Sequence, residues 1–179
     1  MTKTRDQILC VILVFALFSS LGQATAPEAD VSFLQNDATG ISLRYRTPIT
    51  YWAKIETPDR DYYSPYVKGA GMSGSEGMPQ LPVRVIWLAV PPGATPILSA
   101  VIPYGVSSFP KVPAPVPVIT AGADGSVVPV YEEDPGYYNA GSPFPGAWAE
   151  LQEPEAYRDL WIVRLLVYSC RFPSESGGR

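Results

Sequence analysis

From Gly22 onward, proline and glycine recur at intervals that leave little room for helices. The 179 residues include 20 prolines and 15 glycines. Proline inside a helix removes a hydrogen bond and clashes with the preceding turn, and glycine there destabilises the helix by about 1 kcal/mol relative to alanine. We therefore predict an all-β chain with little helix, in which these residues end the strands.

The apolar runs between the breakers are rich in Val, Ile, Tyr and Trp, which favour strands. They cover residues 41–46, 49–56, 83–90, 97–103, 126–131 and 160–168. The runs 83–90 and 160–168 are the most continuously apolar and should be central strands. Pro129 cannot donate to a ladder, so its run should be an edge strand. Short strands at such spacings favour a sandwich or a barrel, and we predict an antiparallel β-sandwich of jelly-roll-like form.

Turn residues separate these runs, and one proline-rich segment stands apart from them. The turns are expected at residues 59–61, 69–77, 91–93, 121–125 and 141–146. Between Val112 and Val118 proline alternates with small apolar residues. This alternation predicts an extended polyproline II segment, which we expect to run along the surface.

The start of the chain has the features of a secretory signal. Basic residues precede an apolar run from Ile8 to Phe18. The run is shorter than the roughly 20 residues that a membrane-spanning helix needs, although an uncleaved anchor is the alternative reading. We predict a signal peptide over residues 1–24, with cleavage after Ala24 or else after Ala26.

Signal removal would leave one exported domain. Residues 25–31 should be a flexible start and residues 32–177 a single domain, since such a length is sufficient for one core. The protein is then expected to be secreted or periplasmic, with no membrane association after signal removal. Cys10 lies within the signal, so Cys170 would remain alone, and we expect it to be a small buried apolar residue.

The sequence contains no histidine. Serine and cysteine nucleophiles are usually activated by an imidazole, and most zinc sites use histidine or several thiolates. We therefore predict no catalytic residue and no cofactor. A glycosidase with two carboxylates would escape this argument, but it needs a cleft lined from distant strands, whereas the acids here cluster in local turns.

Acidic residues dominate the later half of a chain whose net charge is −4. No Lys or Arg occurs between Lys111 and Arg158. Nucleic-acid binding is excluded on this ground, because it needs a clustered basic patch. The run Glu132, Glu133 and Asp134 could supply oxygen ligands to calcium, although a solvated acidic turn is the simpler interpretation.

Two ordered blocks of residues are more specific than the composition. The first places two prolines and a glycine before a strand and a Pro-Pro-Gly turn after it: Gly77, Pro79, Leu81, Pro82, then Pro91, Pro92 and Gly93. The second begins with Tyr131 and the acidic run and continues to the last strand, with Tyr137, Pro145 and Arg158. Together they resemble the amino-terminal prodomain of gingipain-type cysteine peptidases, over almost the whole chain after the signal.

Two positions depart from the pattern of that family. Its members commonly close the domain with an Arg-Gly pair, and here Asp159 follows Arg158. They also carry a Tyr-Pro after the last strand, where this chain has Ser169 and Cys170 after Tyr168.

The resemblance implies a non-catalytic β-sandwich that folds ahead of a peptidase domain, covers its cleft and is cut away on activation. The peptidase domain is absent from this chain, so the partner would lie downstream in cis, making this a truncated zymogen, or act in trans. Some family members insert a basic side chain into the specificity pocket. Only Lys111 or Arg158 could do so here, unless each is a solvated surface charge. A partner that prefers acidic, aromatic or small side chains fits this chain better.

Aromatic residues support a second class of function. Sugar-binding sandwiches use exposed Trp and Tyr as flat platforms, although most aromatics in such domains pack internally. A carbohydrate-binding or adhesion module is therefore the alternative, with these residues as its candidates: Tyr51, Trp52, Tyr62, Tyr63, Tyr66, Tyr137, Tyr138 and Trp148.

Overall fold

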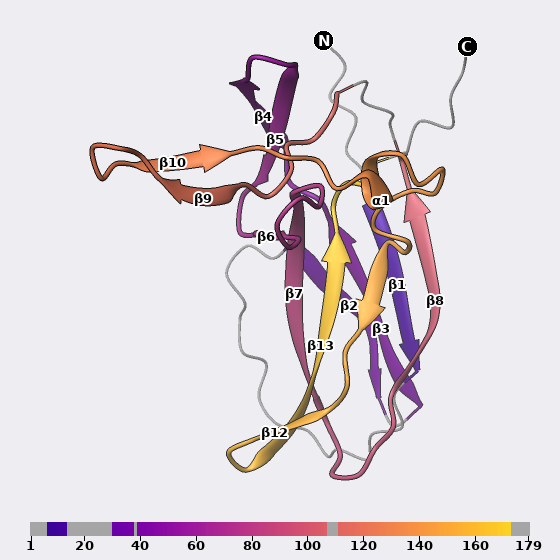
Figure 1. Ribbon diagram of the computed structural model, residues 1–179. Helices are drawn as coiled ribbons and strands as arrows, with labels where there is room; N and C mark the ends of the chain where they lie inside the picture. The colour runs from indigo at the N-terminus through magenta and orange to yellow at the C-terminus, as the bar shows by residue number, and fades with distance from the viewer. Residues whose placement is uncertain (1–6, 14–29, 38, 107–110, 173–179) are drawn as a thin grey trace. The chain divides into compact units, whose positions relative to one another are not determined.

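The computed structural model describes residues 7–13, 30–37, 39–106 and 111–172 (Figure 1). Its strands pair antiparallel throughout. Within the described ranges one α-helix is present, the four-residue α1 (Pro135–Tyr138). The prediction of an all-β chain with little helix is confirmed.

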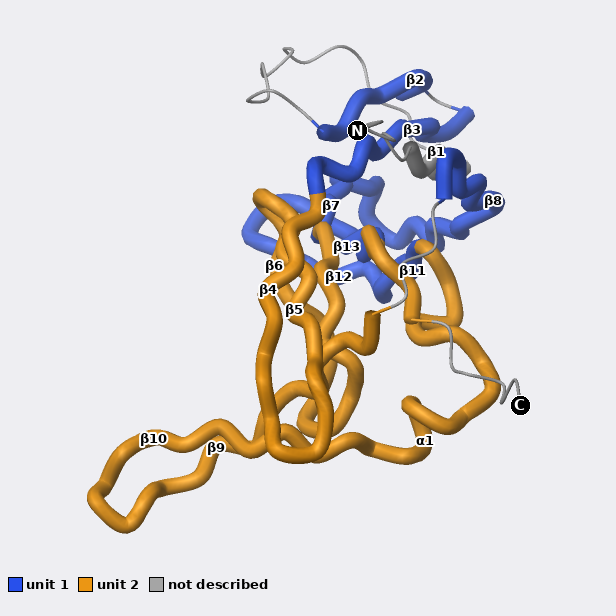
Figure 2. The backbone as a smooth tube through the Cα atoms, turned by 90° about the horizontal axis from the view of Figure 1, so that it is seen from above, with its two compact units in different colours: residues 1–49, 85–108, 149–167 blue, residues 50–84, 109–148, 168–179 orange. Residues whose placement is uncertain are grey.

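The chain divides into two compact units, which Figure 2 colours separately. Unit 1 consists of residues 1–49, 85–108 and 149–167, and unit 2 of residues 50–84, 109–148 and 168–179. Each unit is therefore assembled from three separate stretches of sequence.

The first sheet belongs to unit 1 and has the order β2-β3-β1-β8. Its strands are β1 (Gln7–Leu13), β2 (Val31–Asp37), β3 (Gly40–Arg46) and β8 (Ile97–Tyr104). In β3, the buried residues Ile41, Leu43 and Tyr45 alternate with half-buried Ser42 and Arg44. This alternation gives the sheet one apolar face, as the sequence pattern of β3 predicts.

The second sheet has the order β11-β13-β7-β6, with β12 also paired to β13. Its strands are β6 (Gly71–Ser73), β7 (Leu81–Val90), β11 (Ala149–Leu151), β12 (Glu155–Tyr157) and β13 (Leu160–Tyr168). Both apolar runs predicted to be central, β7 and β13, have neighbours on each side. In unit 1 their buried residues alternate with more exposed ones, and this is consistent with a sandwich: Ile86, Leu88 and Val90 on β7, and Val163, Leu165 and Val167 on β13.

Unit 2 contains two hairpins, β4 (Thr50–Glu56) with β5 (Asp61–Val67) and β9 (Val118–Ala121) with β10 (Val127–Val130). Strand β10 carries Pro129 and pairs only with β9 among the described strands. The predicted edge strand is therefore confirmed, although it is shorter than the run 126–131.

The predicted signal falls partly within the described residues. Gln7–Leu13 forms strand β1, whereas the predicted cleavage positions after Ala24 and Ala26 lie outside the described residues. At the predicted flexible start, Val31 already belongs to β2, and the Asp30 carbonyl accepts a hydrogen bond from the Arg46 amide. No helix in the described part of the chain is long and apolar enough to span a membrane.

Candidate functional site

The proline-rich segment 112–117 belongs to unit 2 and contains buried residues. It is extended, as predicted, but it is not a surface segment: Pro113, Ala114 and Pro115 are buried. The Ala114 amide donates to the Tyr63 carbonyl at 2.9 Å, and the Val116 amide donates to the Met78 carbonyl at 2.9 Å. Because the prolines lack an N–H, Ala114 and Val116 supply the only amide donors of residues 113–117, and since both amides are paired these residues can be buried between their neighbours.

The first sequence block packs beside this segment and meets the second block at Gly77. The Gly77 amide donates to the Val116 carbonyl, and the Gly77 carbonyl accepts from the Asp134 amide at 2.9 Å. The φ of Gly77 is +81°, and a Cβ there would lie 3.1 Å from Asp134 Cβ. Glycine is therefore required both by conformation and by the close approach of the acidic run.

The acidic run itself has three different surroundings. Glu132 is exposed, whereas the Glu133 carboxylate lies 2.9 Å from Arg60 Nη1 and accepts from the Tyr62 hydroxyl at 3.0 Å. Asp134 is the N-cap of α1, and its side chain accepts from the Gly136 amide at 2.8 Å. The described residues contain no group of three His, Cys, Asp or Glu side chains that could hold a metal ion. Calcium binding by these residues stays a prediction.

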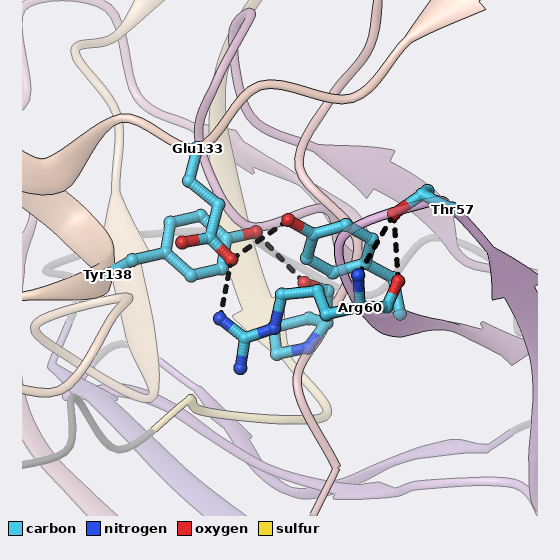
Figure 3. A network of polar contacts seen from close by, with 6 residues as sticks. Thr57, Arg60, Glu133 and Tyr138 are labelled. Atoms are coloured by element: carbon cyan, nitrogen blue, oxygen red, sulfur yellow. Dashed lines mark hydrogen bonds and ion pairs between the residues drawn. The ribbon is translucent and has the colours of Figure 1, made fainter.

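Figure 3 shows the polar network around Glu133. Burial, followed by the hydrogen bond to Glu133, raises the pKa of Tyr62 to about 12. The neighbouring Tyr138 hydroxyl donates to the Pro113 carbonyl at 2.9 Å, and burial raises the pKa of Tyr138 well above its usual range. Both phenols are therefore neutral donors at any physiological pH.

An apolar cluster shares Tyr138 with the network. Its buried members are Leu81, Tyr138 and Phe172, with the Tyr138 and Phe172 rings 5.4 Å apart. Half-buried Tyr137 packs against it and meets Phe144 edge-on at 5.1 Å. Cys170 also packs against this cluster but is half-buried, whereas the sequence predicted a buried residue.

The remaining residues of the two blocks lie at turns and at the cluster margin. Pro91 and Gly93 form the turn after β7, where Gly93 has a φ of +74° and the Pro91 carbonyl accepts from the Ala94 amide. Pro92 is exposed in that turn. Pro145 is buried, and its carbonyl accepts from Arg171 Nε at 2.9 Å. Pro79 and Pro82 are fully buried beside the segment 112–117 and at the start of β7.

The two candidate basic residues differ in accessibility. Lys111 Nζ lies 4.0 Å from the centre of the Tyr63 ring, which is a close cation–π contact on a half-buried side chain. Arg158 is exposed in the turn between β12 and β13 and has a φ of +55°. Of the two, Arg158 is the more accessible to a partner.

Of the hairpin β9–β10, the sequence predicts the turn and the second strand. Strand β9 was missed because it follows directly on the proline-rich segment. Figure 2 shows the hairpin extending away from the rest of unit 2. Ile119 is 59% exposed and Val127 is 72% exposed, so the hairpin carries apolar side chains into solvent. At its tip, Asp124 accepts from the Ser126 amide at 3.0 Å, and hydrogen bonds from Ser126 hold the pKa of Asp124 below its usual range. The hairpin tip therefore presents the ionised carboxylate of Asp124, held by these hydrogen bonds.

Most of the candidate sugar-binding aromatics have internal contacts. Tyr62 and Tyr138 are buried, Tyr137 packs against Phe144, and the Trp148 ring lies 5.3 Å from the Arg171 guanidinium. Tyr63 is covered by Lys111, and Trp52 is half-buried. Tyr51 and Tyr66 differ from the rest: they lie directly opposite each other on β4 and β5 and are 60% and 55% exposed.

Comparisons with known proteins agree with the sequence resemblance. A family model described as Propeptide_C25 matches residues 22–175. A complex of the Porphyromonas gingivalis RgpB pro- and mature domains is similar in structure, with a TM-score of 0.64 and 18% identity, covering 81% of this chain and 76% of that chain. A structure on the zymogenic latency of gingipain K from Porphyromonas gingivalis has a TM-score of 0.53 and 16% identity, covering 84% of this chain and 85% of that chain. At these identities the likeness concerns the fold. No curated protein matches the chain.

Proposed function

We propose, from the premise that the chain belongs to the Propeptide_C25 family, that it is the non-catalytic propeptide of a gingipain-like cysteine peptidase precursor. In this function it restrains a peptidase domain or assists its folding, in cis or in trans. The observation that carries the proposal is the family match over residues 22–175, which spans both units. The lack of histidine supports a non-catalytic role, since no imidazole base is present in the sequence.

The two similar structures support a peptidase domain as the partner. One title names pro- and mature domains in a complex, and the other names zymogenic latency, each for its own protein. Secretion follows as part of the same proposal, because a signal is predicted before residue 25 and the propeptide would accompany an exported enzyme.

The hairpin β9–β10 is the part of unit 2 that best fits a role in contacting the peptidase. An extended ribbon can enter a substrate cleft, where substrates also bind in extended form. Its exposed apolar residues would be buried on binding, and Asp124 would present a carboxylate instead of a basic side chain. The partner would then have a specificity pocket that accepts acidic or small side chains.

Binding of hairpin variants to a mature gingipain-type peptidase tests this proposal. The peptidase is first profiled with fluorogenic substrates ending in Asp, Ala, Phe, Lys or Arg, and affinities are then measured by biolayer interferometry. Asp124→Lys should weaken binding at least about tenfold to a peptidase that prefers acidic residues. The matched control is Asp59→Lys, which makes the same charge change in the exposed turn between β4 and β5.

Equal affinity of Asp124→Lys and Asp59→Lys would place the contact elsewhere and reject the hairpin. Failure of the unaltered chain to bind any such peptidase would reject the propeptide function itself.

The exposed pair Tyr51 and Tyr66 favours carbohydrate binding as a second candidate function. Two aromatic rings on adjacent strands can form a flat apolar platform of the kind that sugars stack on. Affinity electrophoresis in soluble polysaccharides tests this function. Retardation that is lost in Tyr51→Ala would support it, and unchanged migration of the natural chain would reject it.

A further inference from the structure

Strand β1 comes from the segment that the sequence predicts to be the core of a signal peptide. Gln7–Leu13 overlaps the apolar run from Ile8 to Phe18. In the structure the same residues form an inner strand of a four-stranded sheet, between β3 and β8. One segment therefore has two incompatible roles, because a signal peptide is removed and an inner strand is not.

The backbone pairing of β1 is extensive on both sides. On one side it runs from Gln7 opposite Arg46 to Ile12 opposite Ile41, and on the other from Gln7 opposite Tyr104 to Leu13 opposite Ile97. Both pairings are antiparallel. The seven residues of β1 match the seven of β3 and the eight of β8. The space between β3 and β8 thus has the length and the hydrogen-bonding edges for one extended strand.

The attachment of β8 to the first sheet depends on this strand. Among the described strands β8 pairs with β1 alone, whereas β3 also pairs with β2. Without β1, both β3 and β8 would have an unpaired row of amides and carbonyls facing the same space. Unpaired backbone groups of this kind are costly when buried and readily pair with another strand when accessible.

The surroundings of the space are apolar. Ile41, Leu43 and Tyr45 on β3 are buried, with exposed fractions of 6%, 0% and 1%. On β8, Ile97 and Ile102 stay more than half exposed with β1 in place, so the apolar contact lies on the β3 side. An apolar segment is the appropriate occupant beside β3, since it extends the buried face of that strand and completes the ladder.

We propose that the space between β3 and β8 is a strand-binding site, and that before signal removal its occupant is the chain's own Gln7–Leu13. Occupation of this site and removal of the signal exclude one another. A chain that folds before export holds the core of its signal within the sheet, and a chain that loses the signal opens the site. Folding therefore competes with processing.

A register-specific cross-link tests the occupant in the full 179-residue chain. Cys10 lies opposite Val101, and directly opposite residues of an antiparallel pair are close enough for a disulfide. In a Cys170→Ala background, Val101→Cys should form an intramolecular disulfide with Cys10 on mild oxidation, detected by peptide mapping. The matched control is Ile102→Cys, which lies one residue away and hence on the opposite face.

The proposal predicts that the Val101→Cys variant cross-links at least about tenfold faster than the Ile102→Cys control. Equal rates would contradict the register. Disulfide-linked dimers instead of monomers would contradict an occupant from the same chain and indicate strand exchange with a second copy.

Hydrogen exchange on the unaltered chain gives an independent readout that needs no variant. Because β8 has no other strand partner among the described residues, slow exchange of its amides reports occupation of the site. Exchange of the β8 amides as fast as in an unfolded peptide would overturn the proposal.

The competition with processing is tested on the oxidised Val101→Cys chain with purified signal peptidase. Cleavage after residue 24 or 26 should be at least about tenfold slower than in the same chain after reduction, since the peptidase reads the apolar core of the signal and the cross-link holds part of that core in the sheet. Equal cleavage rates would show that occupation and processing are compatible and would contradict the exclusion.

Discussion

Glu133 shows how a single residue of unit 2 acquires a role that its sequence neighbourhood does not predict. Its partners Arg60 and Tyr62 precede it by 73 and 71 positions. Local sequence shows only three consecutive acids, for which calcium binding and solvation were the available interpretations. The side chain is 24% exposed, so the ion pair is partly shielded from water and contributes more than a fully solvated pair would.

Replacing Glu133 should destabilise unit 2. Glu133→Ala removes the acceptor of the Tyr62 hydroxyl and the partner of Arg60, and we expect a loss of about 1–2 kcal/mol in the free energy of unfolding. Urea denaturation provides the measurement. The matched control is exposed Glu132→Ala, expected to change stability by less than about 0.5 kcal/mol. Equal losses in the two variants would contradict the role of the network.

Gly77 and Gly93 separate two reasons why a position requires glycine, namely a positive φ and the lack of space for a Cβ. Their φ angles are similar, +81° and +74°, but a Cβ at Gly77 would lie 3.1 Å from Asp134 Cβ, whereas a Cβ at Gly93 meets no atom within 4 Å. Gly93→Ala should therefore cost about 1 kcal/mol for conformation alone, and Gly77→Ala roughly twice that. Thermal melts compare the two variants. A Gly93→Ala loss equal to that of Gly77→Ala would mean that the close approach to Asp134 has no energetic weight.

Ionisation of Tyr62 should lower the free energy of unfolding at alkaline pH. Its pKa is raised to about 12 in the folded chain by burial and by the hydrogen bond to Glu133. A raised pKa stabilises the folded state below the unfolded value of about 10, and this contribution is lost as the pH rises from about 10 to 12. Unfolding midpoints measured across that interval should fall more steeply for the natural chain than for Tyr62→Phe. Equal slopes for the natural chain and Tyr62→Phe would contradict the raised pKa of Tyr62.

Elements with long, regular apolar patterns were predicted well, and short or composite ones were not. Residues 83–90 and 160–168 match β7 and β13 closely, because strands that cross a core show their burial directly in sequence. Strands β6, β11 and β12 have three residues each, too few for any periodicity. Strand β5 was missed because Pro65 interrupts it.

The proline-rich segment shows that composition can predict an extended backbone but not its burial. Its extended form was predicted correctly from the prolines, but its burial depends on the amides of Ala114 and Val116 finding carbonyls on Tyr63 and Met78. These partners lie far away in sequence, so nothing local distinguishes a buried polyproline stretch from a surface one.

A substitution in the turn between β12 and β13 should stabilise the protein. Arg158 has a φ of +55°, in the left-handed region that favours glycine, and it is exposed. Arg158→Gly should therefore raise stability by about 0.5–1 kcal/mol, seen as a higher thermal midpoint. Asp159→Gly is the control, because Asp159 is not among the residues with positive φ and glycine there only adds unfolded-state entropy. A larger gain from Asp159→Gly would contradict the assigned turn.

At the scale of the whole molecule, the two sequence blocks that carry the family resemblance meet within unit 2. Gly77 contacts Asp134, and Leu81 shares a cluster with Tyr138, although more than fifty residues separate each pair in the chain. Their order could be recognised in the sequence, but their contact could not. The exposed hairpin β9–β10 was predicted only as a turn and one strand, since its position depends on the folded segment before it.

Residual peptidase activity during titration with the purified chain tests the central claim most directly. A mature gingipain-type peptidase is held at a fixed concentration while the chain is added, and turnover of its preferred fluorogenic substrate is recorded. A restraining propeptide should abolish turnover at about one chain per enzyme once the concentrations exceed the dissociation constant. Full activity at micromolar excess of a natively folded chain would contradict the account, as would peptide cleavage by the chain alone.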